Sequence, residues 1–194
     1  MICNQLDYNN ESSIAKAASI ASQDMLLDLV LVTTGILHDR EIMPESSLQE
    51  LSSEKFHHLF KANTILPALA AKHFLPKLTR DRRSIFAAIS ARVGSISDNR
   101  LGGWYAYRAS KAALNMVIKS ASIEMRRRSK QAFVVGLHPG TVDSKLSKPF
   151  QNHVPGSMLF TPEYSAKCLL SVLNQLNEGD SGKCFAWDGK EVEP

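Results

Sequence analysis

A tyrosine and a lysine stand four positions apart, at Tyr107 and Lys111, in the run YAYRASK, and an apolar helical pattern follows them. Residues i and i+4 of a helix share a face, so the phenol and the ammonium are neighbours. A free tyrosine has a pKa near ~10, and a nearby positive charge lowers it. The pair predicts a general acid–base acting on an alcohol or carbonyl oxygen, an effect on the order of 10²–10⁴ in rate.

The spacing alone has low specificity, because many unrelated helices carry a tyrosine and a lysine in this arrangement by chance. Other titratable residues offer no competing chemistry. The six histidines form no metal-ligand pattern such as HExxH, and the three cysteines form no CxxC pair. We therefore expect no metal site, and reduced thiols as in a cytoplasmic protein.

Composition and charge bound the class of protein. The chain has 194 residues, 44% hydrophobic and 22% charged, with a net charge of +4, which is ordinary for one globular domain over 1–194. The basic run 126–128 closes a helical pattern without interleaved aromatic residues, which indicates a solvated helix end and no nucleic-acid surface. No signal peptide or membrane-length apolar stretch is visible, so we expect no membrane association and a cytoplasmic location.

Short apolar runs alternate with longer helical patterns along the chain. Strands are expected at 2–6, 27–33, 84–90, 132–138 and 183–187, and helices at 11–22, 53–78, 107–128 and 162–176. The middle strands are nearly continuous apolar runs, typical of a parallel sheet that is covered on both faces. This alternation predicts an α/β fold, a doubly wound parallel sheet with helices on both faces.

The stretch GGWYAYRASKAALNMVIKSASIEM resembles the active-site helix of the short-chain dehydrogenase/reductase superfamily, especially its C-factor and sniffer-like branch. The similarity continues, in order, through TTGIL, ANTILPALAAKHFLPKL, SIFAAISARVGSI and HPGTVDSKLS. It implies a Rossmann-like fold and an oxidoreductase that interconverts a small-molecule carbonyl and a secondary alcohol with NAD or NADP. It also implies a homo-oligomer, commonly a homodimer, formed through the helices expected at 53–78 and 107–128.

The resemblance implies a catalytic role for each matching position. Tyr107 would give a proton to the carbonyl, or take one from the alcohol, and Lys111 would lower its pKa and bind the nicotinamide ribose. Asn63 matches the family's fourth catalytic position. Because Pro67 lacks an N–H, the carbonyl of Asn63 loses its helical partner. It is then free to accept a hydrogen bond from a water that connects it to Lys111 as a proton relay. A kinked helix with a solvated carbonyl is the alternative.

The resemblance also implies contacts with the cofactor. Thr141 and its neighbouring backbone would hold the nicotinamide carboxamide, because they follow a strand at the carboxyl edge where such folds bind ligands. Gly35 matches a family glycine that lets the backbone approach the cofactor, and Asp7 matches a position near the adenine ring. The cofactor-binding positions are Asp7, Thr33, Gly35, Tyr107, Lys111, Pro139, Gly140 and Thr141.

One departure concerns the serine that usually binds the substrate oxygen. That position is Ala91 here, three residues before Gly94, while Ser90 precedes it. Neighbouring residues of a strand point to opposite faces, so Ser90 serves only if the strand end bulges or twists. We take Ser90 as the candidate; the alternative is a hydrogen-bonded strand end without a catalytic role.

A second departure lies at the amino terminus. The family's first strand–helix–strand unit, with its GxxxGxG turn that cradles the cofactor's pyrophosphate, has no counterpart in this sequence. The chain is therefore interpreted as amino-terminally truncated, with the strands at 2–6 and 27–33 either separated by a gap or in direct contact. The alternative function is a non-catalytic binding or cell-signalling protein that has lost cofactor binding.

Residues 144–160, SKLSKPFQNHVPGSMLF, form a long connection before the next helix. Connections of this length are uncommon unless they have a function. We expect a substrate-binding loop that covers the site.

Overall fold

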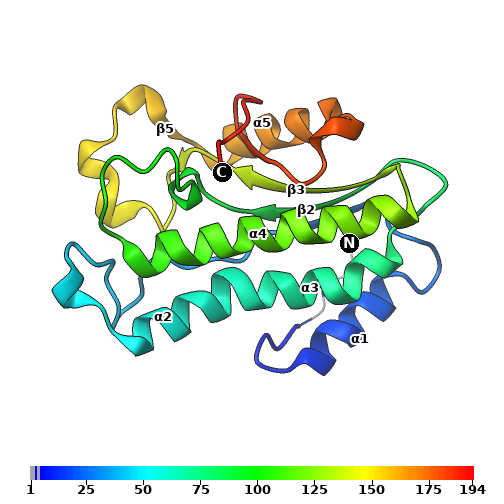
Figure 1. Ribbon diagram of the computed structural model, residues 1–194, viewed down its shortest axis with the longest axis horizontal. Coiled ribbons are helices and arrows are strands. Elements are labelled where there is room, and N and C mark those ends of the chain that lie inside the picture. Colours follow the sequence, from blue (N-terminus) through cyan, green and yellow to red (C-terminus); the bar gives the residue numbers. More distant parts are fainter. Residues whose placement is uncertain (1–2, 4) are drawn as a thin grey trace.

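The computed structural model describes residues 3 and 5–194. Four parallel strands form its main sheet in the order β1-β2-β3-β6: β1 (Leu29–Val32), β2 (Ser84–Ile89), β3 (Ala132–His138) and β6 (Cys184–Ala186). The carboxyl ends of the strands point toward the left-hand side of Figure 1. The predicted parallel α/β sheet is confirmed, with strand ends shifted by at most two residues in the longer runs.

Helices cover both faces of this sheet (Figure 1). The long helix α4 (Tyr105–Arg128) and α3 (Leu66–Phe74) lie on one face, and α5 (Pro162–Gln175) lies on the other. The helix α2 (Ser53–Phe60) precedes α3 and runs beside the first half of α4. Thr161 caps α5 by accepting a hydrogen bond from the Tyr164 amide, as its sequence predicts.

Strand alternation divides the core into two layers. Phe86 and Ala88 of β2 pack toward α3 and α4, while Ile85 and Ala87 pack toward α5. The strand β3 alternates in the same way, which is why both central strands read as uninterrupted apolar runs. The sheet thus provides a rigid base, and its carboxyl edge is where side chains from several elements converge.

The helix expected at 53–78 contains a π-turn at Lys61–Ile65, between α2 and α3. In this turn the Leu66 amide donates to the carbonyl of Lys61, which spaces the backbone ahead of Pro67. Pro67 is accommodated near the start of α3, where its missing N–H costs little. π-turns inside helices often occur at functional sites, and this one carries Asn63.

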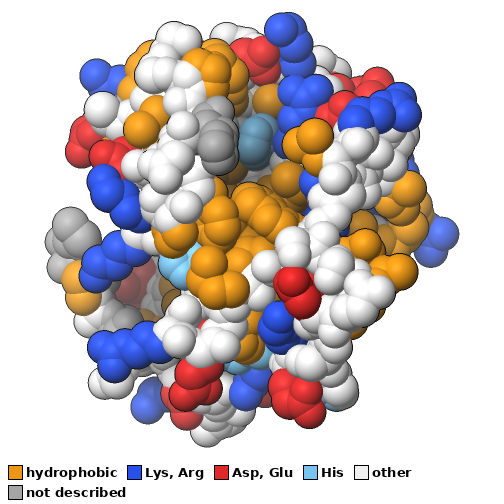
Figure 2. Space-filling view, turned by 90° about the vertical axis from the view of Figure 1, so that its left-hand side faces the viewer, with side chains coloured by type: hydrophobic (Ala, Val, Ile, Leu, Met, Phe, Trp, Pro, Cys, Tyr) orange, Lys and Arg blue, Asp and Glu red, His pale blue; other side chains and the backbone are white. Residues whose placement is uncertain are grey.

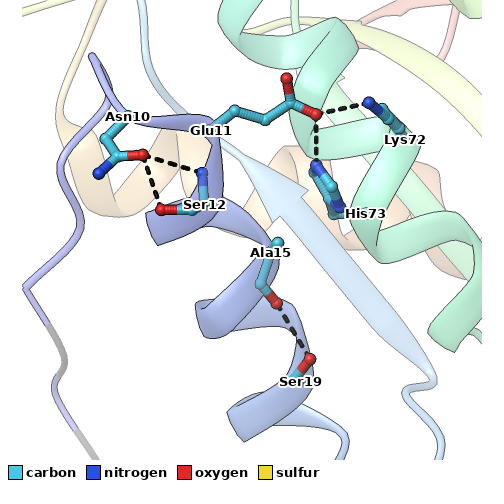
Figure 3. A network of polar contacts seen from close by, with 7 residues as sticks. All are labelled: Asn10, Glu11, Ser12, Ala15, Ser19, Lys72 and His73. Carbon is cyan, nitrogen blue, oxygen red and sulfur yellow. Dashed lines mark hydrogen bonds and ion pairs between the residues drawn. The ribbon is translucent and has the colours of Figure 1, made fainter.

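The first helix, α1 (Glu11–Ala21), packs on α3 on the side away from the sheet. Figure 3 shows its polar contacts: the Asn10 side chain accepts from the Ser12 amide at 3.0 Å, and Glu11 accepts from Lys72 at 2.6 Å and His73 at 2.9 Å. These contacts are local or solvent-exposed. They fix α1 but form no cavity at its amino end.

The predicted strand at 2–6 is only partly described, since residues 1, 2 and 4 lie outside the described residues. Its described positions belong to no strand. Within the described part of the chain, β1 pairs with β2 alone, and Leu29 and Leu31 of β1 are 44% and 40% exposed.

Candidate active site

Tyr107 lies in the first turn of α4, at the carboxyl edge of the sheet. Figure 2 looks onto this edge and shows hydrophobic side chains gathered around a hollow near its centre. The tyrosine is 7% exposed and belongs to an apolar cluster drawn from five separate segments. Its buried neighbours are Leu37, Leu59, Ala91 and Ala106, and its partly buried neighbours are Ile36, Phe56, Val93, Trp104 and Phe150.

Burial in this cluster raises the pKa of Tyr107 to about 12. The sequence predicted the opposite direction, with the pKa of Tyr107 lowered by Lys111. For the chain without cofactor or substrate, that prediction is wrong. The ammonium of Lys111 donates to the Ile89 carbonyl at 2.8 Å and lies 5.8 Å from the centre of the tyrosine ring. Desolvation therefore dominates, and the phenol is protonated at neutral pH.

Lys111 is itself buried, with 2% of its surface exposed, and burial lowers its pKa to about 8. Its Nζ lies directly beneath the backbone of Gly35: a Cβ at that position would be 3.3 Å from Nζ. The lysine thus joins α4 to the ends of β1 and β2. Both groups of the predicted Tyr107–Lys111 pair face the same buried region, as their helical spacing predicts.

The side chain of Asn63 is fully buried and binds backbone on one side and α4 on the other. Its Oδ1 accepts from the Ile36 amide at 2.8 Å, and its Nδ2 donates to the Ile36 carbonyl at 2.9 Å and to Ser110 Oγ at 3.1 Å. Sequence reasoning considered only the backbone carbonyl and missed these bonds. The side chain fastens the loop after β1 to the turn of α4 between Tyr107 and Lys111.

Two further polar residues that the sequence did not single out complete this network. Ser110 Oγ donates to the Tyr107 carbonyl at 2.8 Å, and Thr64 Oγ1 donates to the Ser110 carbonyl at 2.7 Å. Both side chains are buried. The available signal was the position of Ser110 three residues after Tyr107 and four before Leu114, which puts it on the buried side of the helix.

The structure separates Ser90 from the tyrosine. Its hydroxyl donates to Asn115 Oδ1 on α4 at 2.6 Å, whereas Ala91 packs in the same cluster as Tyr107. Strand alternation explains this difference, because consecutive residues point to opposite sides. The position beside the phenol therefore carries a methyl group, and the Ser90 hydroxyl has the structural partner expected of a strand end.

Residues after β1 and β3 fit the nicotinamide end of a dinucleotide. Gly140 has φ +75° and no room for a side chain, since a Cβ would lie 2.5 Å from the Phe160 ring. Thr34 Oγ1 is buried without a hydrogen-bond partner among the described residues, beside Gly35. Such an unpaired hydroxyl is costly unless a ligand completes it. Thr141 lies in β4 (Thr141–Val142), immediately after Gly140.

The described residues do not fit the pyrophosphate end. The first glycine of the chain is Gly35, so no glycine-rich turn precedes α1. That helix starts instead with Asn10 and the acidic Glu11, which disfavours a phosphate. Asp7 is exposed, and its carboxylate accepts from the Asn9 amide at 2.9 Å.

The segment 144–160 contacts the site through aromatic residues of the Tyr107 cluster. Its end pairs with β4 through β5 (Leu159–Phe160), and Phe150 packs on Trp104 with ring centroids 4.9 Å apart. His38 Nε2 lies 3.2 Å and 3.1 Å from two backbone carbonyls of the segment, those of residues 145 and 146. The loop after β1 and this segment thus meet beside Tyr107.

His138, at the end of β3, is a buried titratable residue that the sequence analysis did not single out as a site residue. Burial, and secondly the nearby Arg92 guanidinium, lower its pKa to about 4. Its Nδ1 has no hydrogen-bond partner among the described residues.

The described residues offer neither a metal-binding cluster nor a helix that could span a membrane. No group of three or more His, Cys, Asp or Glu side chains there is arranged to hold a metal ion. None of the helices described is both long and apolar enough to cross a membrane.

Comparison with known proteins agrees with this geometry. Residues 1–155 match the family model described as short chain dehydrogenase. The C-signal protein of Myxococcus xanthus is 37% identical over 134 residues, covering 69% of this chain and 75% of that protein. A 1-hydroxy-2-glutathionyl-2-methyl-3-butene dehydrogenase of Rhodococcus is 30% identical over 186 residues, covering 95% of this chain and 76% of the relative.

Solved structures share the fold. The NADPH-bound carbonyl reductase from chicken fatty liver superposes with a TM-score of 0.82 at 28% identity, covering 97% of this chain and 75% of that one. The carbonyl reductase Sniffer of D. melanogaster has a TM-score of 0.83 at 24% identity, covering 98% and 77%. The chain therefore belongs to the short-chain dehydrogenase family of NAD(P)-dependent oxidoreductases.

Proposed function

We propose that this chain reduces the carbonyl group of a small molecule to a secondary alcohol, with Tyr107 as the proton donor. The single observation that carries the proposal is the buried phenol of Tyr107, one helical turn before Lys111, in the apolar cluster at the carboxyl edge of the sheet. A phenol with a pKa near about 12 holds its proton at neutral pH, which suits the direction of carbonyl reduction. The dehydrogenase and carbonyl reductase names of similar proteins support this reaction class.

The cofactor, when bound, supplies the hydride that the carbonyl carbon receives. Tyr107 Oη gives its proton to the carbonyl oxygen as the alcohol forms, and the phenolate left behind is stabilised by the Lys111 ammonium. The Lys111 pKa of about 8 leaves it a substantial charged fraction at neutral pH and suits it to return a proton. Asn63 positions the helix turn that carries both, and its carbonyl remains our candidate for a water relay.

We also propose the cofactor contacts of the nicotinamide end, at Thr33, Gly35, Pro139, Gly140 and Thr141, and a substrate-covering role for 144–160. Support comes from the buried Thr34 hydroxyl, which has no hydrogen-bond partner among the described residues, and from the packing of Phe150 on Trp104. Ser90 is a weaker candidate because its hydroxyl is bound by Asn115. A homo-oligomer fits the groove that α3 and α4 form between Ala68 and Arg128.

A second function class is favoured by one specific observation. The site has Ala91 in place of a hydroxyl beside the tyrosine. This favours a binding or signalling protein of the same fold without turnover, and one relative carries the name C-signal. In this alternative, the chain would bind neither NADH nor NADPH at millimolar concentration.

The deciding experiment is a reduction assay of the purified chain with NADPH and NADH over a panel of aldehydes and ketones. Tyr107→Phe is expected to lower the rate by about 10²–10⁴ while leaving the thermal midpoint in place. The matched control is Tyr105→Phe, which removes a hydroxyl two residues earlier in the same helix and is expected to change the rate by less than about threefold. Equal rates for wild type and Tyr107→Phe, or no turnover at all, would overturn the proposal.

A further inference from the structure

Glu45 is a fully buried carboxyl in the loop after β1, far from Tyr107 in sequence. Its Oε2 accepts from the Ala106 amide at 3.2 Å, across 61 residues, and its backbone carbonyl accepts from the Trp104 amide at 2.5 Å. Its Oε1 has no hydrogen-bond partner among the described residues, and no Lys or Arg there pairs with it. A buried acid is costly unless its contacts do something that an apolar residue cannot.

The Glu45 contacts supply the cap that the catalytic helix lacks. Three other helices are capped by their own preceding residue: α1 by Asn10, α2 by Ser52 and α5 by Thr161. The residue before α4 is Trp104, whose side chain makes no capping bond. The positive end of a helix dipole favours a carboxyl group, so the distant Glu45 takes the place of a local cap.

The turn before α4 is unusual in its backbone. Gly102, Gly103 and Trp104 all have positive φ, at +66°, +62° and +52°, and Trp104 is the single non-glycine residue with positive φ in the described chain. A side chain in this region is strained and persists only where its surroundings hold it. The Arg108 guanidinium donates to the carbonyls of Gly102 and Gly103 at 3.1 Å and 3.0 Å, opposite the Glu45 contacts.

The held turn presents the Trp104 ring to the site. Its centroid lies 6.3 Å from that of Tyr107 and 4.9 Å from that of Phe150, which comes from the 144–160 segment. The first turn of α4 and the neighbouring aromatic rings of Trp104 and Phe150 therefore depend on the same two Glu45 contacts.

We infer that Glu45 is a positioning residue for the catalytic turn: it caps α4 across the fold and holds Trp104 in its left-handed conformation beside Tyr107. Its catalytic consequence rests on the proposed function, whereas its structural consequence does not. The carboxyl touches neither substrate nor cofactor and acts through the amide of residue 106, while the backbone carbonyl of Glu45 accepts from the amide of residue 104.

Amide hydrogen exchange of the chain alone tests this directly. Glu45→Ala is expected to speed exchange at residues 104–108 by about tenfold, the effect of losing a buried cap, while residues 118–125 of the same helix change by less than about twofold. Glu45→Gln keeps a carbonyl oxygen for the Ala106 amide and should restore protection to within about threefold. If Glu45→Ala does not fold, Glu45→Asp, which shortens the reach by one methylene, replaces it in the same comparison.

The matched control is Glu50→Gln, five residues later. Glu50 accepts from the Ser46 amide and hydroxyl, within its own loop, so its loss should leave exchange at 104–108 unchanged. Exchange that rises evenly over α4 and the sheet in Glu45→Ala would reveal only general destabilisation and would overturn the inference. Equal effects of Ala and Gln at position 45, or no effect, would also overturn it.

Where the chain turns over a carbonyl substrate, Glu45→Ala should lower kcat by about tenfold at a temperature where every variant is folded, with rescue by Gln. An unchanged kcat beside altered exchange would reject the catalytic consequence. If wild type shows no turnover, the proposed function fails while the exchange comparison still decides the role of Glu45 as a cap.

Discussion

Asn63 and Asn10 both hydrogen-bond backbone or side-chain groups near a helix end, yet they lie in regions of very different construction. Asn63 is fully buried and joins Ile36 and Ser110, which are 27 and 47 residues away. Asn10 is exposed, and among the described residues its side chain bonds Ser12 alone, two residues on. The region that would face a nicotinamide is thus preorganised by long-range buried contacts, whereas the amino-terminal region is held by local capping and surface ion pairs.

This difference separates two tasks that a dinucleotide enzyme combines. Proton transfer needs Tyr107 and Lys111 fixed against the sheet, and the buried network around Asn63 and Ser110 provides that. Phosphate binding needs backbone amides free at a helix start, and α1 offers Asn10 and Glu11 instead. We propose that residues 1–194 carry the first task; the second has no counterpart among the described residues.

The largest expected effect comes from truncating the two asparagines. Asn63→Ala leaves the Ile36 amide and carbonyl unpaired inside the protein and should lower the free energy of unfolding by about 2–4 kcal/mol. Asn10→Ala removes an exposed cap and should cost about 1 kcal/mol. Urea unfolding of both variants measures the two values. A cost for Asn63→Ala no larger than that for Asn10→Ala would erase the distinction between the regions.

Acid should destabilise the site region through His138. Its folded pKa of about 4 lies below the unfolded value of 6.5, so between these pH values the unfolded chain binds the proton and the folded chain does not. Stability therefore falls as the pH is lowered from 6.5 to 4, by about 2–3 kcal/mol for this group. His138→Gln should remove that part of the slope, and His57→Gln, on exposed α2, should keep it.

A hydroxyl placed beside the phenol tests the difference between positions 90 and 91 within the site. Ala91→Ser places an oxygen in the Tyr107 cluster, where it can donate to a substrate carbonyl, and should raise kcat/KM by about tenfold. Ser90→Ala, which loses the bond to Asn115 instead, should lower stability by about 1 kcal/mol with little change in kcat. Steady-state kinetics measure both variants. A lower kcat/KM in Ala91→Ser, or a large loss of kcat in Ser90→Ala, would instead favour Ser90 as the hydroxyl that binds the substrate oxygen.

Local patterns predicted the scaffold well and the environment of the site poorly. The apolar runs of β2 and β3 and the Tyr107–Lys111 spacing carry their structure in neighbouring residues, which a single sequence displays. The raised pKa of Tyr107 arises from side chains as distant as Leu37 and Phe150. The side-chain bonds of Asn63 and the cap by Glu45 likewise join segments far apart, and no short window of sequence contains both partners.

The most direct test compares reduced nicotinamide mononucleotide with NADPH as hydride donors for the same carbonyl substrate. A chain that holds the nicotinamide end alone gains little from the adenosine and its two phosphates, so kcat/KM should agree within about threefold between the donors. The rate with both donors should also vanish together in Tyr107→Phe. Preference for NADPH by more than about a hundredfold, or activity that survives the loss of the phenol, would contradict the account.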